Sequence, residues 1–123
     1  EGRGCLVMAA GAVEVTDGDT LKIDGQRIRL IGYDAPEPRR AKCDAEKALG
    51  LASTKATAQL LSEAGRVTFV FEGVDRYDRP LAHIWIDDRH MGEALRELGL
   101  AARWDYAGGQ AKPRWCDDQP NAK

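Results

Sequence analysis

One stretch of the chain decides its fold class: Leu21-Lys22-Ile23-Asp24-Gly25-Gln26-Arg27-Ile28-Arg29. Its central Asp-Gly pair is a signal for a two-residue hairpin turn, because both residues tolerate the positive φ that such turns need. Apolar residues alternate with polar ones on both sides of the turn. We therefore expect two antiparallel strands here, the second of which continues to Tyr33 and stops at Pro36.

The elements that follow the hairpin suggest a small barrel. Apolar residues recur at helical spacing over residues 44–64 and again over residues 91–98, which predicts two helices. Residues 67–71 and 81–86 are rich in the β-branched and aromatic residues that favour strands. About five strands with an interposed helix are typical of the OB fold. We expect an α+β protein: a small five-stranded OB-type Greek-key barrel with two or three helices.

Size and charge narrow the class of protein. The chain has 123 residues, 43% of them hydrophobic and 31% charged, which fits one globular domain. Its net charge of −2 argues against binding nucleic acid through bulk positive charge, but not against a local arginine cluster. No apolar run is long enough for a membrane helix. We divide the chain into an N-terminal lead (1–11), a domain (12–107) and an extended tail (108–123).

Two features bear on the compartment. The apolar, small-residue tract at residues 5–12 is similar to the end of an export signal, or is an ordinary first strand. The three cysteines, Cys5, Cys43 and Cys116, fit no zinc-binding spacing. In an oxidising compartment we expect Cys43 and Cys116 to pair and tie the tail to the domain. The expected location is secreted or periplasmic; three reduced thiols in the cytoplasm are the alternative.

Acidic residues flank the hairpin. Asp19 precedes the first strand, and Asp34 and Glu37 follow the second. Because a tight turn places the two outer ends of a hairpin together, the three carboxylates are expected to crowd one end of the sheet. Oxygen ligands without histidine favour a hard cation such as Ca²⁺ or Mg²⁺. A plain β-turn is the alternative interpretation of the Asp-Gly-Asp-Thr sequence alone.

Two arginines change the balance between these interpretations. Arg29 lies on the second hairpin strand, and Arg79 lies in the turn that precedes the strand at residues 81–86. Two guanidinium groups facing a cation site can bind phosphate oxygens and stabilise the charge of phosphoryl transfer. Structural salt bridges with the acidic residues are the alternative.

These motifs together resemble the staphylococcal-nuclease-like, or thermonuclease, family. The matching stretches occur in family order at residues 15–20 (VTDGDT), 27–37 (RIRLIGYDAPE), 75–82 (DRYDRPLA) and 92–101. The resemblance implies an OB-fold barrel that hydrolyses phosphodiester bonds of DNA and RNA with Ca²⁺ and leaves 3′-phosphate ends. Single-stranded DNA and RNA are the implied substrates. Because nothing in the sequence suggests an assembly, we expect a monomer that needs no partner protein and no membrane.

The resemblance also implies roles for individual residues. Asp19, Asp34 and the backbone carbonyl of Ala35 correspond to the Ca²⁺ ligands. Glu37 corresponds to the carboxylate that orients or deprotonates the attacking water, and the phosphate-binding arginines are Arg29 and Arg79. Four further residues are candidate substrate contacts, the aromatic ones having packing as the alternative: Arg76, Tyr77, Trp104 and Tyr106.

Two other functions remain open at this point. One is a nucleic-acid-binding OB-fold module that has lost turnover. The other is a secreted interaction domain in which Ca²⁺ at the acidic cluster is purely structural. Loss of a ligand or of a phosphate-binding arginine would favour the binding module, and this sequence has all of them.

Overall fold

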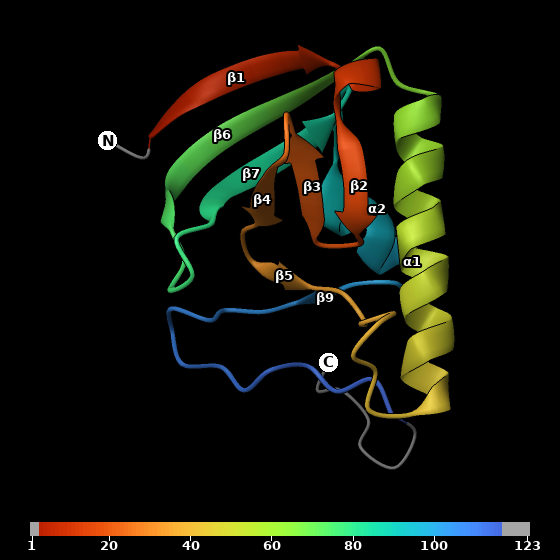
Figure 1. Cartoon of the computed structure of the whole chain (residues 1–123). Coiled ribbons are helices and arrows are strands. Elements are labelled where there is room, and N and C mark those ends of the chain that lie inside the picture. The colour runs from red at the N-terminus through yellow and green to blue at the C-terminus, as the bar shows by residue number, and fades with distance from the viewer. Residues whose placement is uncertain (1–2, 117–123) are drawn as a thin grey trace.

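The computed structural model describes residues 3–116, whose strands form a curled sheet beside a long helix (Figure 1). The sheet order is β1-β6-β7-β4-β3-β2, with β8 beside β7, and only β4 and β7 pair in parallel. A smaller sheet pairs β5 with β9. The curled mixed sheet with two helices confirms the expected α+β fold of the OB type. The strands are β1 (Arg3–Ala9), β2 (Glu14–Asp17), β3 (Thr20–Ile23), β4 (Gln26–Leu30), β5 (Tyr33–Asp34), β6 (Arg66–Val74), β7 (Pro80–Ile86), β8 (Arg89–His90) and β9 (Ala102–Arg103).

The hairpin forms as predicted, but its second strand is shorter. Asp24 and Gly25 have φ values of 49° and 81°, and Leu21 lies opposite Ile28. The second strand was expected to reach Tyr33, whereas β4 ends at Leu30 and the chain turns at Gly32, with φ of 82°. This left-handed turn re-aims the chain, so that β5 pairs with β9 instead of extending the main sheet.

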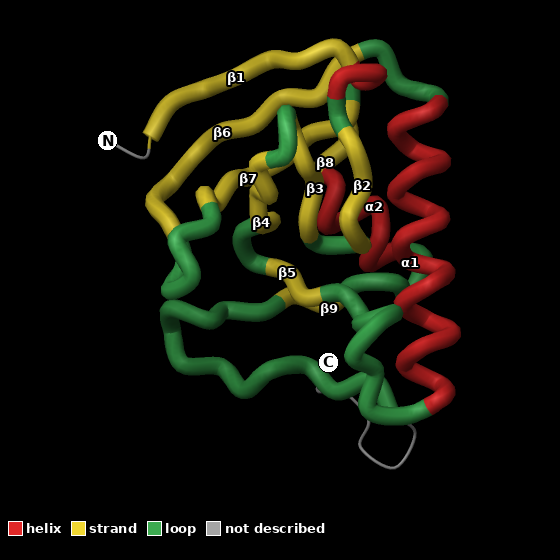
Figure 2. The backbone as a smooth tube through the Cα atoms, in the orientation of Figure 1, coloured by secondary structure: helices red, strands yellow, loops and turns green. Residues whose placement is uncertain are grey.

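The core lies between the concave side of the curled sheet and the two helices, α1 (Asp44–Ser62) and α2 (Met91–Glu97). Alternate residues of β6 and β7 are fully buried, because successive side chains of a strand point to opposite faces. Helix α1 stands against β2, and α2 packs on β7 (Figures 1 and 2). The largest core side chains are Leu21, Leu30, Phe69, Ile84, Met91 and Leu95.

The first and last segments of the described residues are tied to the barrel. The tract at residues 5–12 forms most of β1 and the 3-10 turn η1 (Ala10–Ala12), and β1 pairs with β6 along its length. After β9 the chain has no helix or strand up to Cys116, and it folds back beneath β5 (Figure 2). A disulfide joins Cys43 to Cys116. Residues 117–123 of the expected tail lie outside the described residues. Among residues 3–116 no helix is long and apolar enough to cross a membrane.

An ion-pair network centred on Glu93 links α2 to the small sheet. Its carboxylate accepts hydrogen bonds from Arg103 at 2.9 and 3.0 Å, from Arg96 at 3.2 Å, and from the Tyr33 hydroxyl. Hydrogen bonds from Arg103, Tyr33 and Arg96 lower the pKa of Glu93 to about 2. The network fastens β5, which carries Asp34, to the helix behind it.

This depressed pKa predicts a specific loss of stability in acid. The stabilisation that ionised Glu93 contributes is fully present above its ordinary pKa of 4.5 and is lost as the pH falls toward 2. We expect Glu93→Gln to flatten the dependence of the unfolding free energy on pH in this window. Urea unfolding at a series of pH values tests this, with Glu97→Gln on the same helix as the control. Equal pH dependence in the wild type and Glu93→Gln would contradict the prediction.

Candidate active site

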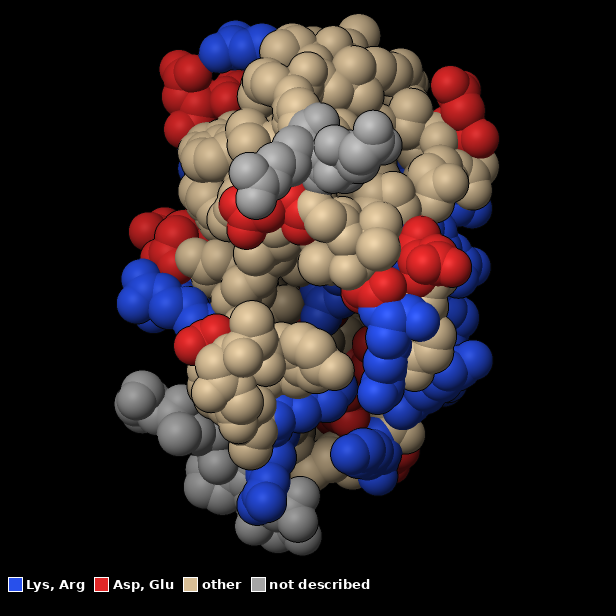
Figure 3. Space-filling model, turned by 90° about the vertical axis from the view of Figure 1, so that its left-hand side faces the viewer, with Lys and Arg blue, Asp and Glu red and all other residues tan. Residues whose placement is uncertain are grey.

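An open cleft of about 1420 Å³ lies between the lower end of the barrel and the returning C-terminal segment. The loop between β6 and β7 and the loop before α1 complete its walls. Figure 3 shows blue Lys and Arg side chains gathered over the lower half of this face, with red carboxylates visible between them. The cleft therefore has a locally basic rim in an acidic protein. Its basic lining residues are Arg27, Arg29, Arg39, Arg40, Lys42, Arg76, Arg79, Arg103 and Lys112.

Arg29 joins the two acidic ends of the hairpin at the base of this cleft. Its Nη1 lies 3.1 Å from Asp19 Oδ2, and its Nη2 lies 3.6 Å from Asp34 Oδ1. The Ala35 backbone N–H also donates to Asp19 Oδ2 at 3.0 Å. The hairpin therefore brings Asp19 and Asp34 together, as the spacing in the sequence implies.

The three charged side chains are largely buried, and burial acts on the pKa of Asp19. The side chains of Arg29, Asp19 and Asp34 are 13%, 6% and 2% exposed. Burial opposes ionisation of Asp19, but the Arg29 guanidinium and several hydrogen bonds hold its pKa below the ordinary value. Arg29 is itself oriented, because Nη1 also donates to the Tyr33 carbonyl oxygen at 3.1 Å. Arg29 and Asp19 thus form a charged pair whose geometry is fixed by several hydrogen bonds.

Glu37 lies beside this centre, half-buried in the loop that follows β5. Burial raises its pKa above the ordinary value, and the negative charges of Asp19 and Asp34 add to the effect. A carboxylate with a raised pKa is suited to accept a proton from water near neutral pH. Glu37 is therefore a half-buried carboxylate beside Asp19 and Asp34 whose pKa lies above its ordinary value.

Glu46, on the first turn of α1, positions the loop that carries Glu37. Its carboxylate is 5% exposed and accepts hydrogen bonds from the backbone N–H groups of Glu37 at 3.0 Å and Lys42 at 2.9 Å. One turn later, a Cβ on Gly50 would lie 2.5 Å from the backbone carbon of Glu37 and the nitrogen of Pro38. The helix thus packs directly against the loop backbone. Sequence reasoning missed Glu46, although a glycine inside a predicted helix is a signal of close packing.

We expect Gly50→Ala to destabilise the protein, by about 1–3 kcal/mol, because the new methyl group overlaps backbone atoms that cannot rotate away. A glycine-to-alanine change in a helix without such a contact stabilises by up to about 1 kcal/mol. Urea unfolding of the purified variant measures the change. A variant as stable as the wild type, or more stable, would show that the helix does not pack against this loop as described.

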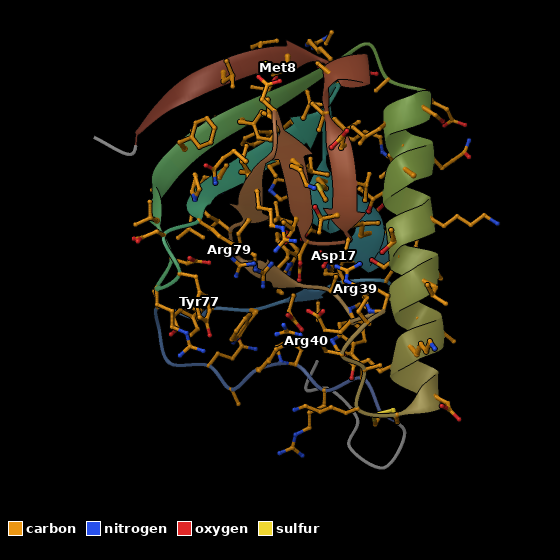
Figure 4. All side chains as sticks on the ribbon, in the orientation of Figure 1. Met8, Asp17, Arg39, Arg40, Tyr77 and Arg79 are labelled. Atoms are coloured by element: carbon orange, nitrogen blue, oxygen red, sulfur yellow. A yellow bond between two sulfur atoms is a disulfide. The ribbon has the colours of Figure 1, made fainter. Side chains whose placement is uncertain are left out.

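Arg79 lies on the opposite wall from α1, in the turn immediately before β7 (Figure 4). Its Nε donates to Asp75 Oδ2 at 2.7 Å, so its partner is this neighbouring carboxylate, whereas Arg29 pairs with Asp19 and Asp34. The Tyr77 ring lies 5.7 Å from the Arg79 guanidinium and is 65% exposed. Tyr77 lines the cleft with Arg76 and does not pack in the barrel. The two arginines face one cleft but are held by different acids.

Trp104 and Tyr106 form a further aromatic pair on the cleft, just after β9. Their rings meet edge to face with centroids 5.3 Å apart, and Tyr106 is 63% exposed. Trp104 also donates from Nε1 to the Gln110 carbonyl oxygen at 2.9 Å. The alternative of packing in the barrel core does not describe these rings, since both line the open cleft. They provide flat surfaces on which a base can stack.

The C-terminal segment places two unexpected donors on Asp34. Lys112 Nζ lies 2.8 and 2.9 Å from its two carboxylate oxygens, and Trp115 Nε1 donates to Oδ2 at 3.0 Å. Burial raises the pKa of Asp34 above the ordinary value, and the Lys112 ammonium opposes this. Among residues 3–116, no three acidic, histidine or cysteine side chains gather as a metal site. The three expected carboxylates thus share one cleft without forming a ready cluster.

Asp17 is a second group that sequence reasoning did not assign to the site. Burial and the negative charge of Asp19 raise its pKa to about 7. Its Oδ2 lies 3.3 Å from Arg39 Nη2, on the loop before α1 (Figure 4). Arg39 therefore links the strand that enters the hairpin to the loop that bears Glu37.

Comparison with known proteins agrees with this arrangement. The family model described as staphylococcal nuclease homologue matches residues 27–123. The chain is 34% identical over 91 residues to a thermonuclease of Staphylococcus intermedius, which covers 71% of this chain and 54% of the relative. It is 38% identical over 113 residues to the succinoglycan biosynthesis protein ExoI of Rhizobium meliloti. That match covers 89% of this chain and 54% of the relative.

Another relative is an uncharacterized endonuclease of Haemophilus influenzae, 28% identical over 116 residues, with 90% of this chain and 60% of the relative covered. The chain spans little more than half the length of these curated relatives. The family model covers more than half of this chain and includes Arg29, Asp34, Glu37 and Arg79. With its OB-type barrel and these residues at one cleft, the chain belongs to the staphylococcal nuclease homologue family.

Proposed function

We propose that this protein is a Ca²⁺-dependent nuclease that hydrolyses phosphodiester bonds of DNA and RNA and leaves 3′-phosphate ends. The observation that carries the proposal is the buried bridge from Arg29 to Asp19 and Asp34 beside a half-buried Glu37, in an open, basic-rimmed cleft. Relatives named thermonuclease and endonuclease support the same reaction class.

The donor groups fit a hard divalent cation. Asp19, Asp34 and the Ala35 carbonyl offer oxygen atoms only, which is the ligand type that Ca²⁺ takes. The Asp34 carboxylate already attracts a cation, since the Lys112 ammonium lies 2.8 Å from it. These residues would hold the cation, which would supply positive charge to neutralise the phosphate.

The protein's own side chains divide the remaining work. Arg29 and Arg79 bind phosphate oxygens and stabilise the charge that develops on them. The Glu37 carboxylate takes a proton from a water molecule, whose oxygen forms a bond to phosphorus. The bond from phosphorus to the 5′ oxygen breaks, and that oxygen takes a proton from solvent water. The products are a 3′-phosphate and a 5′-hydroxyl.

Substrate preference follows from what lines the cleft. Arg76, Tyr77, Trp104 and Tyr106 offer charge and stacking surfaces along the strand, and none of these contacts requires a particular base. Phosphate contacts fix position but carry no sequence information. We therefore propose single-stranded DNA and RNA as substrates with slight base preference, cut by a monomer without an obligate partner. The Cys43–Cys116 disulfide favours an oxidising, secreted or periplasmic location.

The proposal is tested by incubating the protein with single-stranded DNA and with RNA, in millimolar Ca²⁺ or in excess chelator. We expect cleavage of both substrates in Ca²⁺, none in chelator, and fragments that a 3′-phosphatase converts to 3′-hydroxyl ends. Fragments that carry 5′-phosphates would contradict the proposed direction of bond breaking. Cleavage that survives the chelator would contradict the role of the cation.

One observation favours a second function, a silent nucleic-acid-binding module. Lys112 pairs with Asp34, and Arg29 pairs with Asp19. The two carboxylates are therefore neutralised by the protein's own side chains, as in a cluster that has only a structural role. A binding module predicts that single-stranded DNA binds in the cleft and is recovered intact in Ca²⁺. A structural Ca²⁺ domain predicts a raised melting temperature in Ca²⁺ and no nucleotide binding.

A further inference from the structure

Residues 104–116, here called the strap, follow β9 and return beneath β5 toward the start of α1 (Figure 1). At one end the Trp104 backbone N–H donates to the Gly32 carbonyl oxygen at 2.8 Å. At the other end Cys116 is bonded to Cys43, the N-cap residue of α1. Between them Gln110 braces the strap, because its side-chain oxygen accepts from the Asp105 N–H at 2.8 Å. The strap therefore has a defined path over Asp34.

This path delivers Lys112 to the carboxylate that is proposed to bind the divalent cation. The ammonium contacts both oxygens of Asp34 at 2.8 and 2.9 Å, while that side chain is only 2% exposed. A divalent cation bound to the same oxygens would lie within a few ångströms of the ammonium, and like charges at that separation repel. Lys112 and the cation therefore exclude one another from Asp34.

Lys112 is able to leave, whereas Asp34 is not. The Lys112 side chain is 47% exposed and sits on a flexible four-carbon stem. The ammonium also lies 5.5 Å from the Trp104 ring in this position, beside the open cleft. Asp34 is held in strand β5. A divalent cation can therefore replace the Lys112 ammonium at Asp34 only if the lysine side chain moves away.

We propose that Lys112 is a tethered competitor for the divalent cation, and that it sets the cation affinity of the site. The Cys43–Cys116 disulfide keeps the ammonium at a high effective concentration beside Asp34, as any short tether does for an intramolecular ligand. This inference rests on the proposed cation site at Asp19 and Asp34. It adds a residue, Lys112, that determines how much Ca²⁺ the protein needs.

The test measures Ca²⁺ binding directly, by isothermal titration calorimetry without substrate. We expect Lys112→Met to bind Ca²⁺ at least about tenfold more tightly than the wild type, since it removes a charged hydrogen bond from the competing state. Lys42→Met is the matched control: it removes one positive charge from the same cleft, but no contact to Asp34. We expect its affinity to stay within about twofold of the wild type, the residual effect of a screened surface charge.

The outcomes separate this inference from the proposed function. Equal Ca²⁺ affinity in the wild type and Lys112→Met would show that Lys112 does not compete with the cation. The proposed cation site would be unaffected by that result. If neither protein binds Ca²⁺, the proposed cation site fails and the competition fails with it. If Lys42→Met tightens binding as much as Lys112→Met, the effect is general charge and the specific competition is wrong.

The tether has its own test in the double variant Cys43→Ser/Cys116→Ser. Serine at position 43 keeps an acceptor for the Glu46 N–H, which Cys43 Sγ now caps at 3.4 Å, so the helix start is preserved. We expect this variant to bind Ca²⁺ more tightly than the wild type, and Lys112→Met to add less in its background than it does alone. Unchanged affinity in the double variant would show that the disulfide does not hold Lys112 in place.

Discussion

Glu37→Gln is expected to lower the turnover of single-stranded DNA by at least about a hundredfold, because an amide cannot accept the proton of the attacking water. The glutamine side chain has nearly the same shape as glutamate and can still form hydrogen bonds. The backbone N–H of Glu37 still donates to Glu46, so the loop stays in place. Affinity for the nucleic acid is therefore expected to change little. The effect belongs to the chemical step and not to binding.

The measurement pairs turnover with binding on one oligonucleotide. Steady-state kinetics give the turnover number, and fluorescence anisotropy in Ca²⁺, extrapolated to the time of mixing before any cleavage, gives the dissociation constant. Glu72→Gln is the control, since Glu72 also lines the cleft but is exposed on β6. Turnover of Glu37→Gln within about threefold of the wild type would remove Glu37 from the role of general base.

Arg29→Ala is expected to abolish activity almost completely and to weaken the fold as well. Loss of one donor to the developing phosphate charge costs about 10²–10³ in turnover. The change also leaves the buried carboxylates of Asp19 and Asp34 without their shared guanidinium. Breaking a buried ion pair in this way costs about 3–5 kcal/mol, an upper range here because Lys112 still neutralises Asp34.

Arg29→Lys separates the two effects. Lysine keeps the charge that the buried acids need but lacks the planar fork that grips two phosphate oxygens. We expect this variant to remain folded by circular dichroism and urea unfolding, and to lose at least about a hundredfold in turnover. Arg27→Ala is the control on the same strand, because Arg27 is exposed at the cleft. Full activity in Arg29→Lys would reduce Arg29 to a structural counter-charge.

The parts of the site that lie near the hairpin could be predicted from the sequence. The two-residue turn fixes the register of β3 and β4, which places Asp19 beside the end of β4. The turn at Gly32 and the pairing of β5 with β9 then bring Asp34 to the same place. The helix over α1 followed from apolar spacing, although it ends at Ser62 and not at residue 64. Short-range patterns therefore predicted the buried centre and most of the barrel.

The remaining parts depend on contacts that no local pattern encodes. Lys112 and Trp115 reach Asp34 from 78 and 81 residues away, and only the folded strap shows which lysine arrives there. The raised pKa of Asp17 needs the burial that the loop before α1 creates. The preference of Arg79 for Asp75 was open, since the sequence places acids near it on both sides of the turn. Tertiary packing decides each of these.

The most direct test of the central claim follows one labelled single-stranded oligonucleotide through binding and cleavage in the same samples. Wild type and Glu37→Gln are each mixed with it in Ca²⁺ and in chelator, and bound fraction and fragments are measured together. We expect both proteins to bind the oligonucleotide in Ca²⁺ and only the wild type to cut it at an appreciable rate. Binding by the folded wild type with the oligonucleotide left intact in Ca²⁺ would contradict the nuclease and leave the binding module in its place.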